Sequence, residues 1–251
     1  MMNKSYMKCK DISFSYESGT DILRNISFQA QKEEAIGLIG ANGVGKSTLL
    51  RILIGLELNF TGEAVVNDIS VNKKNLPVIR SQIGYLFQDS DNQLFTQNVY
   101  NDIAFALRNY GIQEKEVDER VMAALDIMGI RHLKDKKIYK MSGGEKKMAS
   151  IATILAMNPE IILLDEPTIA LDPKNRRNLI QTLNNLGYIK IIATHDLDMV
   201  LETCDRVILL SEGRIIADGS TEEILFNKEL LETNGLELPL CIGGYVKKSR
   251  I

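Results

Sequence analysis

The segment Gly40–Thr48, with the sequence GANGVGKST, combines residue types and spacing suited to holding phosphate groups. It fits the pattern GxxxxGK[ST], in which glycines let the backbone curl so that successive N–H groups converge on phosphates. The Lys46 ammonium would reach the β- and γ-phosphates, and the Ser47 hydroxyl would ligate Mg²⁺. The sequence therefore predicts a nucleoside triphosphate site whose residues are Gly40, Asn42, Gly43, Gly45, Lys46, Ser47 and Thr48.

Two adjacent carboxylates follow the apolar run Ile161–Leu164. Asp165 would end a buried strand, where a carboxylate can serve Mg²⁺ directly or from the second layer around the ion. Glu166 would point to the opposite side of the strand end, and we interpret it as the general base for an attacking water. Alone, the pair could be two solvated acids after a strand. Together with the glycine-rich loop, it indicates phosphoanhydride hydrolysis.

The elements around these residues indicate an α/β fold. Ala35–Ile39 is predicted to be a buried strand that leads into the loop, and Thr48–Leu56 a helix that adds its positive N-terminal end to the phosphate site. The short apolar runs Ile161–Leu164 and Ile189–Ala193 are separated by a helix near Lys174–Leu186. This order predicts a parallel sheet with crossover helices.

Other segments surround this core. Asp11–Tyr16 and Asn25–Ala30 alternate apolar and polar residues about a turn at Glu17–Thr20, and a hairpin is predicted from Asp205 to Ala217 about Ser211–Gly213. The middle of the chain instead favours helices. The predicted helices are 99–110, 114–128 and 145–157. We expect a core of residues 1–88 and 159–225, a helical subdomain at about 89–158, and a helical or irregular extension at 226–251 that ends in basic residues 247–250.

Composition narrows the class of protein. Of the 251 residues, 45% are hydrophobic and 25% charged, which suits a globular chain that buries a core. The formal net charge of −3 and the lack of a long basic run argue against bulk nucleic-acid binding. The scattered cysteines, Cys9, Cys204 and Cys241, are expected to be unpaired thiols of a reducing compartment. No apolar run approaches the ~18 residues of a membrane span, and no signal peptide is expected.

Further motifs, in order along the chain, resemble those of ABC ATPases. Gln88 resembles the Q-loop glutamine, which touches Mg²⁺ or the attacking water, and Ser142-Gly143-Gly144-Glu145 resembles the signature motif. Ala170-Leu171-Asp172 resembles the D-loop, and His195 the switch histidine that contacts the γ-phosphate. Tyr16 resembles the aromatic residue that stacks on adenine, although an ordinary strand tyrosine remains an alternative. The resemblance covers roughly 10–220 and implies a P-loop NTPase (RecA-like) core with an N-terminal antiparallel β subdomain and an inserted helical subdomain.

The signature segment has a physical explanation in this family. A hydroxyl and glycine N–H groups at the start of a helix, expected here at Gly144 or Glu145, make an anion site. If the helical insert extends outward, that site lies beyond reach of the chain's own phosphate loop. The resemblance implies that it instead contacts ATP bound by a second copy or a related ATPase, in a head-to-tail dimer to which Ser142, Gly143, Gly144 and Asp172 contribute.

The segments Gln88–Phe95, Asp102–Phe105 and Leu155–Glu160 resemble ATPase subunits of energy-coupling-factor importers, especially the cobalt/nickel group; a generic ABC importer ATPase is the alternative. Such subunits lie on the cytoplasmic face of the membrane beside integral subunits, and the docking groove would be near Gln88–Ala106. Met148 stands where arginine usually follows the signature, which puts the packing of that helix in question.

The resemblance thus implies an ATP- and Mg²⁺-dependent ATPase that energises uptake of a cobalt or nickel ion or a vitamin, without nucleic acid as a partner. The alternatives are a soluble ABC ATPase outside transport, the ATPase of an exporter, and a regulatory subunit that has lost hydrolysis. Intact Gln88, Glu166 and His195 argue against the last of these.

Overall fold

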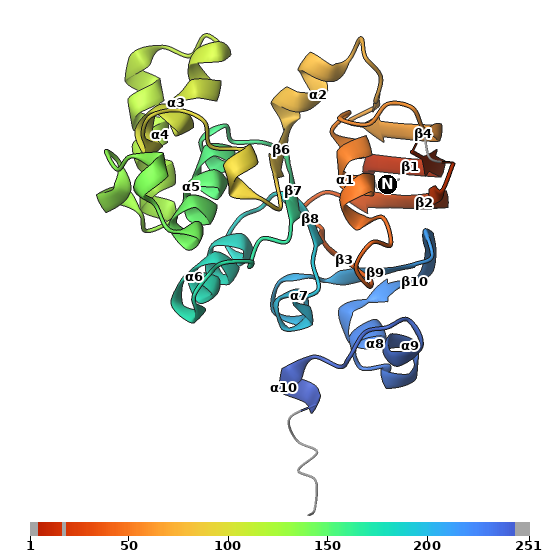
Figure 1. Ribbon diagram of the computed structural model, residues 1–251. Helices are drawn as coiled ribbons and strands as arrows, with labels where there is room; N and C mark the ends of the chain where they lie inside the picture. Colours follow the sequence, from red (N-terminus) through yellow and green to blue (C-terminus); the bar gives the residue numbers. More distant parts are fainter. Residues whose placement is uncertain (1–4, 17–18, 244–251) are drawn as a thin grey trace, which may run out of the picture. The chain divides into compact units, whose positions relative to one another are not determined.

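The computed structural model describes residues 5–16 and 19–243, and the chain forms two compact units (Figure 1). The first unit contains the chain up to Ile79 and again from Ile189, and the second contains Arg80–Tyr188. The predicted turn residues 17–18 and the basic residues 247–250 lie outside the described part. The architecture is mixed α/β and contains the predicted antiparallel β subdomain and helical insertion.

An antiparallel sheet opens the first unit. Its strand order is β2-β1-β4-β5. Along β2 every second side chain from Ile26 to Ala30 is buried, because successive side chains of a strand point to opposite faces. One face of the sheet therefore contributes to the core and the other meets solvent. The strands are β1 (Ser5–Ser15), β2 (Asp21–Gln31), β4 (Thr61–Val66) and β5 (Ile69–Ser70).

A second group of strands in this unit runs in the order β10-β9-β3-β8. The strand β3 pairs in parallel with both β8 and β9, and all of its residues are buried. The predicted hairpin is confirmed as β9 and β10, whose turn residues Glu212 and Gly213 have φ of 47° and 74°, as a type I′ turn requires. The elements are β3 (Ala35–Ile39), α1 (Lys46–Leu53), β8 (Ile189–Ala193), α7 (Leu197–Thr203), β9 (Arg206–Ser211) and β10 (Arg214–Ser220).

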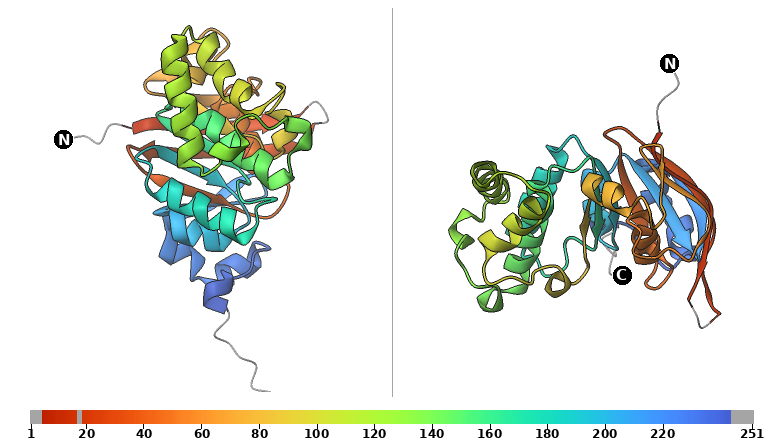
Figure 2. Two further views of the ribbon diagram at one scale, coloured as in Figure 1. Left: turned by 90° about the vertical axis from the view of Figure 1, so that its left-hand side faces the viewer. Right: turned by 90° about the horizontal axis from the view of Figure 1, so that it is seen from above.

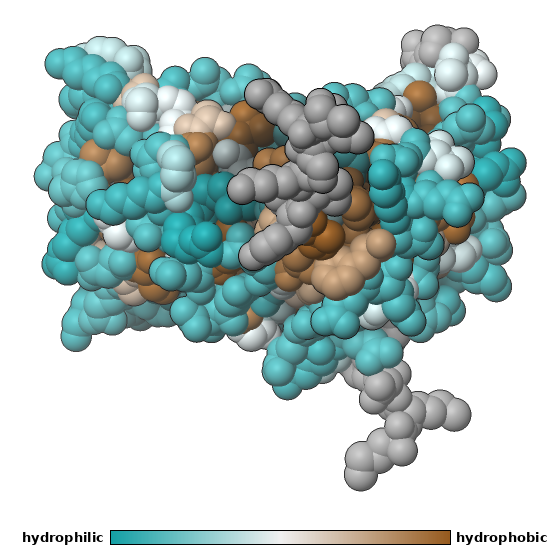
Figure 3. Space-filling view, turned by 90° about the horizontal axis from the view of Figure 1, so that it is seen from below, coloured by the Kyte–Doolittle hydropathy of each residue, from teal (hydrophilic) through white to brown (hydrophobic). Residues whose placement is uncertain are grey.

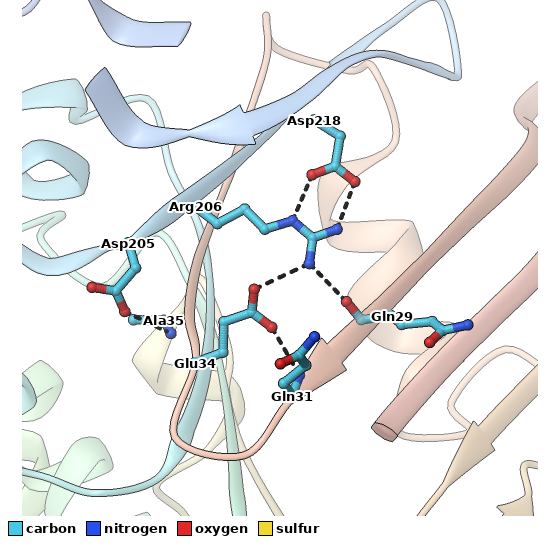
Figure 4. Close-up of polar contacts among 7 residues, drawn as sticks. All are labelled: Gln29, Gln31, Glu34, Ala35, Asp205, Arg206 and Asp218. Atoms are coloured by element: carbon cyan, nitrogen blue, oxygen red, sulfur yellow. Dashed lines mark hydrogen bonds and ion pairs between the residues drawn. The ribbon is translucent and has the colours of Figure 1, made fainter. Parts of the chain in front are cut away.

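Arg206 ties these strands together (Figure 4). Its guanidinium donates two parallel bonds to the Asp218 carboxylate, and Nη1 donates to the Gln29 carbonyl at 2.9 Å and to Glu34 Oε1 at 3.1 Å. Glu34 in turn accepts a bond from the Gln31 backbone N–H at 2.8 Å. The bonds to Asp218 and Glu34 raise the pKa of Arg206, so its guanidinium stays charged. It therefore keeps its bidentate bonds to Asp218 at the junction between β2, β3, β9 and β10.

Short helices complete the first unit: α8 (Thr221–Leu225), α9 (Lys228–Thr233) and α10 (Leu240–Gly243). The Asp198 carboxylate in α7 accepts bonds from the backbone N–H groups of Leu240 and Cys241 at 3.1 and 3.0 Å. The surface in Figure 3 is largely hydrophilic, with hydrophobic residues gathered in limited patches. Phe226 and Leu240 keep 55% and 79% of their surface exposed, so this C-terminal segment carries apolar surface.

The second unit contains a parallel pair of buried strands, β6 (Ile83–Leu86) and β7 (Ile161–Asp165). The chain enters it through α2 (Leu76–Gln82) and leaves it after α6 (Pro173–Asn184). Between the strands lie α3 (Val99–Asn109), α4 (Glu114–Ile127) and α5 (Gly143–Ala156), which pack on one another (Figure 2). Short 3₁₀ turns occupy Ser90–Asn92, Arg131–Leu133 and Ile138–Lys140.

The spacing of the buried residues shows which face of α3 packs into this bundle. In α3 the buried residues Val99, Ile103 and Leu107 recur at the spacing of one helical face, and Asn98 caps the helix by accepting the Asn101 N–H at 2.9 Å. The predicted helices 99–110 and 114–128 are confirmed to within one residue at their ends. The third helix begins at Gly143 rather than Gly144 or Glu145, because Ser142 already caps it.

Candidate active site

The phosphate loop, Gly40–Thr48, joins β3 to α1 and needs glycine at two positions. Gly40 has φ 149°, and a Cβ atom there would lie 2.3 Å from the Leu210 carbonyl oxygen. Gly45 has φ 106° at the start of α1, and a Cβ atom would lie 2.6 Å from Leu23 Cδ2. The backbone therefore curls so tightly against Leu210 and Leu23 that a residue larger than glycine would not fit at these two positions.

Lys46 lies inside this curl. Its side chain is buried, and Nζ donates to the Gly40 carbonyl at 2.7 Å and the Ala41 carbonyl at 3.1 Å. A cation, a tightly curled backbone and the start of α1 thus converge within one short segment, a donor set that fits phosphate. Ser47 lies in the first turn of α1 and is partly buried, whereas Asn42 and Gly43 are exposed at the tip of the loop.

Tyr16 also belongs to the first unit. Its ring packs edge-to-face on Phe14 with the centroids 4.8 Å apart, and its hydroxyl lies 3.5 Å from the Thr48 hydroxyl. Thr48 is buried, and its hydroxyl is a hydrogen-bond partner of the Tyr16 hydroxyl. Tyr16 keeps 40% of its surface exposed, which leaves part of the ring accessible for stacking.

Replacing Gly40 with alanine should destabilise the protein much more than the same change at Gly43. The Cβ atom at position 40 meets backbone, whereas at position 43 it meets nothing within 4 Å and only the left-handed φ of 80° is unfavourable. We expect a loss of about 3 kcal/mol or more for Gly40→Ala and about 1 kcal/mol for Gly43→Ala. Thermal unfolding of both variants measures this, and equal losses would contradict the tight curl at Gly40.

His195 lies two residues after the end of β8 and is exposed. The residues on either side of it are fixed by local bonds: the Thr194 hydroxyl accepts the Asp196 N–H at 3.0 Å, and Asp196 caps α7 by accepting the Met199 N–H at 2.9 Å. The backbone at His195 is therefore held between a buried strand and a capped helix. This position at the C-terminal end of a parallel strand is where open α/β sheets present ligand-contacting residues.

The two carboxylates lie in the second unit, at the end of β7. Asp165 is 2% exposed and accepts a bond from the Tyr85 hydroxyl at 3.5 Å, and Glu166 is 6% exposed. Glu166 has φ 48°, a left-handed conformation that is unfavourable for a residue with a side chain. Such strain concentrates at functional positions, where the surrounding structure enforces it. Because of this positive φ, the chain turns away from the direction of β7 at Glu166.

Gln88 follows β6 in the same unit and is exposed. The segment Phe87–Gln93, here called the glutamine segment, is held by a residue that the sequence analysis did not single out. Gln93 Oε1 accepts the Phe87 N–H at 3.3 Å, and Gln93 Nε2 donates to the Ser150 carbonyl and the Thr153 hydroxyl of α5, both at 2.9 Å. The two contacts with α5 join residues distant in sequence, so no local pattern could have indicated them.

The signature and D-loop segments lie against each other. A Cβ atom on Gly144 would lie 2.8 Å from the Ala170 carbonyl oxygen, and one on Gly143 would lie 3.3 Å from Ala170 Cβ. Ala170 itself has φ 69°, and Asp172 caps α6 by accepting the Asn175 N–H at 2.8 Å. The structure thus brings Gly143 and Gly144 together with the segment that resembles the D-loop.

Ser142 and Glu145 form a reciprocal cap at the start of α5. Ser142 Oγ accepts the Glu145 N–H at 3.3 Å, and Glu145 Oε2 accepts the Ser142 N–H at 2.8 Å. Lys136 Nζ also donates to Glu145, at 2.7 and 2.8 Å to its two oxygens. The bond from Lys136, followed by that from Ser142, lowers the pKa of the Glu145 carboxyl.

This lowered pKa predicts that the Glu145 contribution to stability disappears in acid. The contribution is complete above the unfolded-state pKa of about 4.3 and is lost as the pH falls through the lower folded-state value. In urea unfolding, Glu145→Gln should be less stable than the wild type at pH 7, and the gap should close towards pH ~3. Glu119→Gln, at an exposed position of α4 outside this cap, is the control, and its stability at pH 7 should stay within about 0.5 kcal/mol of the wild type.

The predicted site residues thus fall into two groups. Tyr16, the phosphate loop and His195 belong to the first unit, whereas the second contains Gln88, Ser142, Gly143, Gly144, Asp165, Glu166 and Asp172. Within the described part of the chain, no helix is long and apolar enough to span a bilayer. In the same ranges, three or more His, Cys, Asp or Glu side chains do not gather into a metal-binding group.

Comparison with known proteins identifies the family. Residues 23–169 match the family model described as ABC transporter. The chain is 38% identical to the energy-coupling factor transporter ATP-binding protein EcfA3 of Clostridium perfringens, covering 95% of this chain and 86% of that one. The structure of cbiO1 from Clostridium perfringens, titled part of the ABC transporter complex cbiONQ, matches with 38% identity, a TM-score of 0.80 and coverage of 96% and 98%.

A second solved structure adds a nucleotide state. The ATP-binding cassette MJ0796, titled a dimeric post-hydrolysis state bound to ADP and Pi, is 27% identical, with a TM-score of 0.80 over 86% of this chain and 98% of that one. The chain is therefore similar in structure to this nucleotide-bound protein, although the two sequences are only 27% identical. The chain therefore belongs to the family of ABC transporter ATP-binding proteins, is similar to energy-coupling-factor and CbiO ATP-binding subunits, and is an ATPase.

Proposed function

We propose that this chain is the ATP-hydrolysing subunit of a membrane importer that takes up a micronutrient, either a cobalt or nickel ion or a vitamin. The observation that carries the proposal is the 38% identity to cbiO1 over nearly the whole of both chains, since that protein is titled part of the complex cbiONQ. The subunit would sit on the cytoplasmic face of the membrane and bind integral subunits there. The cargo would be held by those subunits.

Nucleotide binding is assigned to the first unit. The loop amides and Lys46 would hold the phosphates, Tyr16 would stack on the base, and His195 would contact the γ-phosphate. The oxygens of Ser47, Gln88 and Asp165 are the hard donors that Mg²⁺ prefers. When bound, Mg²⁺ would neutralise charge that develops on the phosphates. The chain's own contribution would be to hold these oxygens, and the burial of Asp165 and the place of Ser47 in the first turn of α1 support this role.

Hydrolysis is assigned to Glu166. Its carboxylate would accept a proton from the attacking water, while Gln88 would orient that water. The left-handed backbone at Glu166, with φ of 48°, supports this role, because strained conformations concentrate at functional positions. We interpret the helical segment at about 89–158 as the subdomain that carries the signature to a partner's nucleotide.

Dimer formation follows from the signature segment. Ser142 and the glycines form the N-terminus of α5, a helix of 14 residues whose end attracts anions. In the proposed head-to-tail dimer, this end meets the γ-phosphate of ATP bound by the partner, either a second copy or a related ATPase. ATP then holds the two chains together, and hydrolysis releases them.

An aromatic pair supports the proposed docking of a membrane subunit. Phe95 and Phe105 pack edge-to-face with their centroids 4.8 Å apart, yet remain 65% and 43% exposed. Buried Asp102 holds this surface in place by accepting the Phe95 N–H at 3.1 Å and the Thr96 hydroxyl at 2.8 Å. Leu94, in the same segment, is buried and belongs to the core.

Purification of the tagged full-length chain from native membranes tests the proposal. We expect integral membrane subunits to co-purify with it, and we expect them to be lost in a variant with Phe95→Ser and Phe105→Ser. Tyr139→Ser, which changes an aromatic residue that is 78% exposed elsewhere in the second unit, is the matched control. Uptake of labelled cobalt, nickel and vitamins by cells with and without the chain then identifies the cargo. Recovery of the chain only from the soluble fraction, alone, would refute a transport role.

A further inference from the structure

Lys147 is an almost fully buried cation in α5. It is 2% exposed, although lysine is among the residues least often buried. Its Nζ donates to the Gln88 backbone carbonyl at 2.6 Å and lies 3.3 Å from the Phe87 carbonyl. A buried ammonium is expensive to desolvate unless it is hydrogen-bonded, so these carbonyls account for its position. The side chain thus links the signature helix directly to the residue we assign to the attacking water.

The charges around Lys147 belong to the same region. Burial lowers its pKa, and the carboxylates of Asp165, Asp89 and Glu166 act in the opposite direction. Two of these three carboxylates are the ones we assign to Mg²⁺ and to the general base. The Lys147 ammonium therefore interacts electrostatically with carboxylates of the proposed hydrolysis site, in addition to its hydrogen bonds with the backbone of Phe87 and Gln88.

The hydrogen bonds of Lys147 act together with those of Gln93. Gln93 holds the Phe87 N–H and reaches Ser150 and Thr153 of α5, while Lys147 holds the carbonyls of Phe87 and Gln88. The backbone before and at Gln88 is therefore fixed to α5 on both its donor and its acceptor side, whereas the Gln88 side chain remains exposed. Helix α5 also packs against β6, from which the glutamine segment emerges (Figure 1).

We infer that Lys147 is a positioning residue, which fixes the Gln88 backbone to the signature helix so that the two move as one body. This rests on the proposed function. In that function the start of α5 contacts the nucleotide of the partner, whereas Gln88 serves the nucleotide of its own chain. Lys147 would then make the placement of Gln88 depend on where the signature helix is held. Engagement of α5 by one nucleotide would thereby set the geometry of hydrolysis at the other.

Steady-state ATP hydrolysis by the full-length chain, measured in a double-mutant cycle, tests the inference. We expect Lys147→Met to lower kcat about tenfold or more with KM for ATP changed less than about twofold, because misplacing a water-orienting group affects the chemical step. In a Gln88→Ala background, Lys147→Met should change kcat by less than about twofold, because its effect passes through Gln88. Lys147→Gln, whose amide NH2 can still donate but carries no charge, should give an intermediate kcat and provides a second variant if Lys147→Met folds poorly.

The control is Lys146→Met, the same change at the preceding position of α5. Lys146 pairs with Asp91, whose side chain is 65% exposed, so its loss should leave kcat within about twofold. Full turnover in Lys147→Met beside an impaired Gln88→Ala would overturn this inference alone, and so would losses that add in the double variant. Wild-type turnover in Gln88→Ala would instead overturn the proposed role of Gln88 and, with it, the inference.

Discussion

Replacing Glu166 with glutamine should abolish ATP hydrolysis while ATP binding persists. Glutamine keeps the size of the side chain but cannot accept a proton from water, and removing a general base typically costs ~10²–10⁴-fold in rate. ATP held without hydrolysis should then accumulate in the closed dimer. Phosphate release measures the rate, equilibrium titration with ATP measures binding, and light scattering with and without MgATP measures the dimer.

The matched control is Glu160→Gln. It makes the same change at an exposed residue just before the other end of β7, so it alters neither the buried carboxylates nor the strained backbone. We expect wild-type turnover and no ATP-dependent accumulation of dimer in this variant. Normal hydrolysis by Glu166→Gln would remove Glu166 from the role of general base. A monomer that hydrolyses ATP at the full rate would refute the proposed dimer as well.

Much of the local structure was predictable because its signals are local. The helices 99–110 and 114–128 carry apolar residues at helical spacing, and the hairpin turn at Glu212–Gly213 needs residues that tolerate positive φ. The loop at Gly40–Thr48 is defined by glycines whose necessity the structure explains through contacts with Leu210 and Leu23. In each case the residue types that indicate the conformation lie within the segment itself, although the contacts that require glycine at Gly40 and Gly45 come from outside it.

Other features were missed because partners far along the chain determine them. The strand β4 has an exposed start and only a few buried residues, so its alternation is weak, and β1 supplies its pairing. The short helices α2 and α7 have too few turns for a periodic signal. The packing of Gly144 on Ala170 and the burial of Lys147 depend on tertiary contacts that no spacing in the sequence reveals.

The burial of Met148 explains how the signature helix accommodates methionine where the family pattern has arginine. The sequence places methionine where arginine usually follows the signature, which put the packing of the helix in question. In the structure Met148 is 1% exposed, so it packs into the core, as a flexible apolar side chain can. The adjacent Lys147 supplies a buried cation in the same turn of α5, and its hydrogen bonds run to the glutamine segment within its own unit.

Replacing Ser142 with aspartate should separate the two roles of this residue. Aspartate caps helices as well as serine does, so the Glu145 N–H keeps an acceptor and stability should change by less than about 0.5 kcal/mol. The added negative charge would, however, face the γ-phosphate of the partner's ATP and repel it. We expect hydrolysis to fall by ~10²-fold or more and the ATP-dependent dimer to disappear, while each chain still binds ATP at its own loop.

The control, Ser142→Ala, should show the opposite pattern. It removes the cap at a cost of about 1 kcal/mol but adds no charge, so this variant should unfold at a lower temperature yet retain much more activity than the aspartate variant. Thermal unfolding, ATP titration and phosphate release on the two variants measure these quantities. Loss of ATP binding by the isolated Ser142→Asp chain would place Ser142 in its own chain's nucleotide site, because only then could its charge act without a partner.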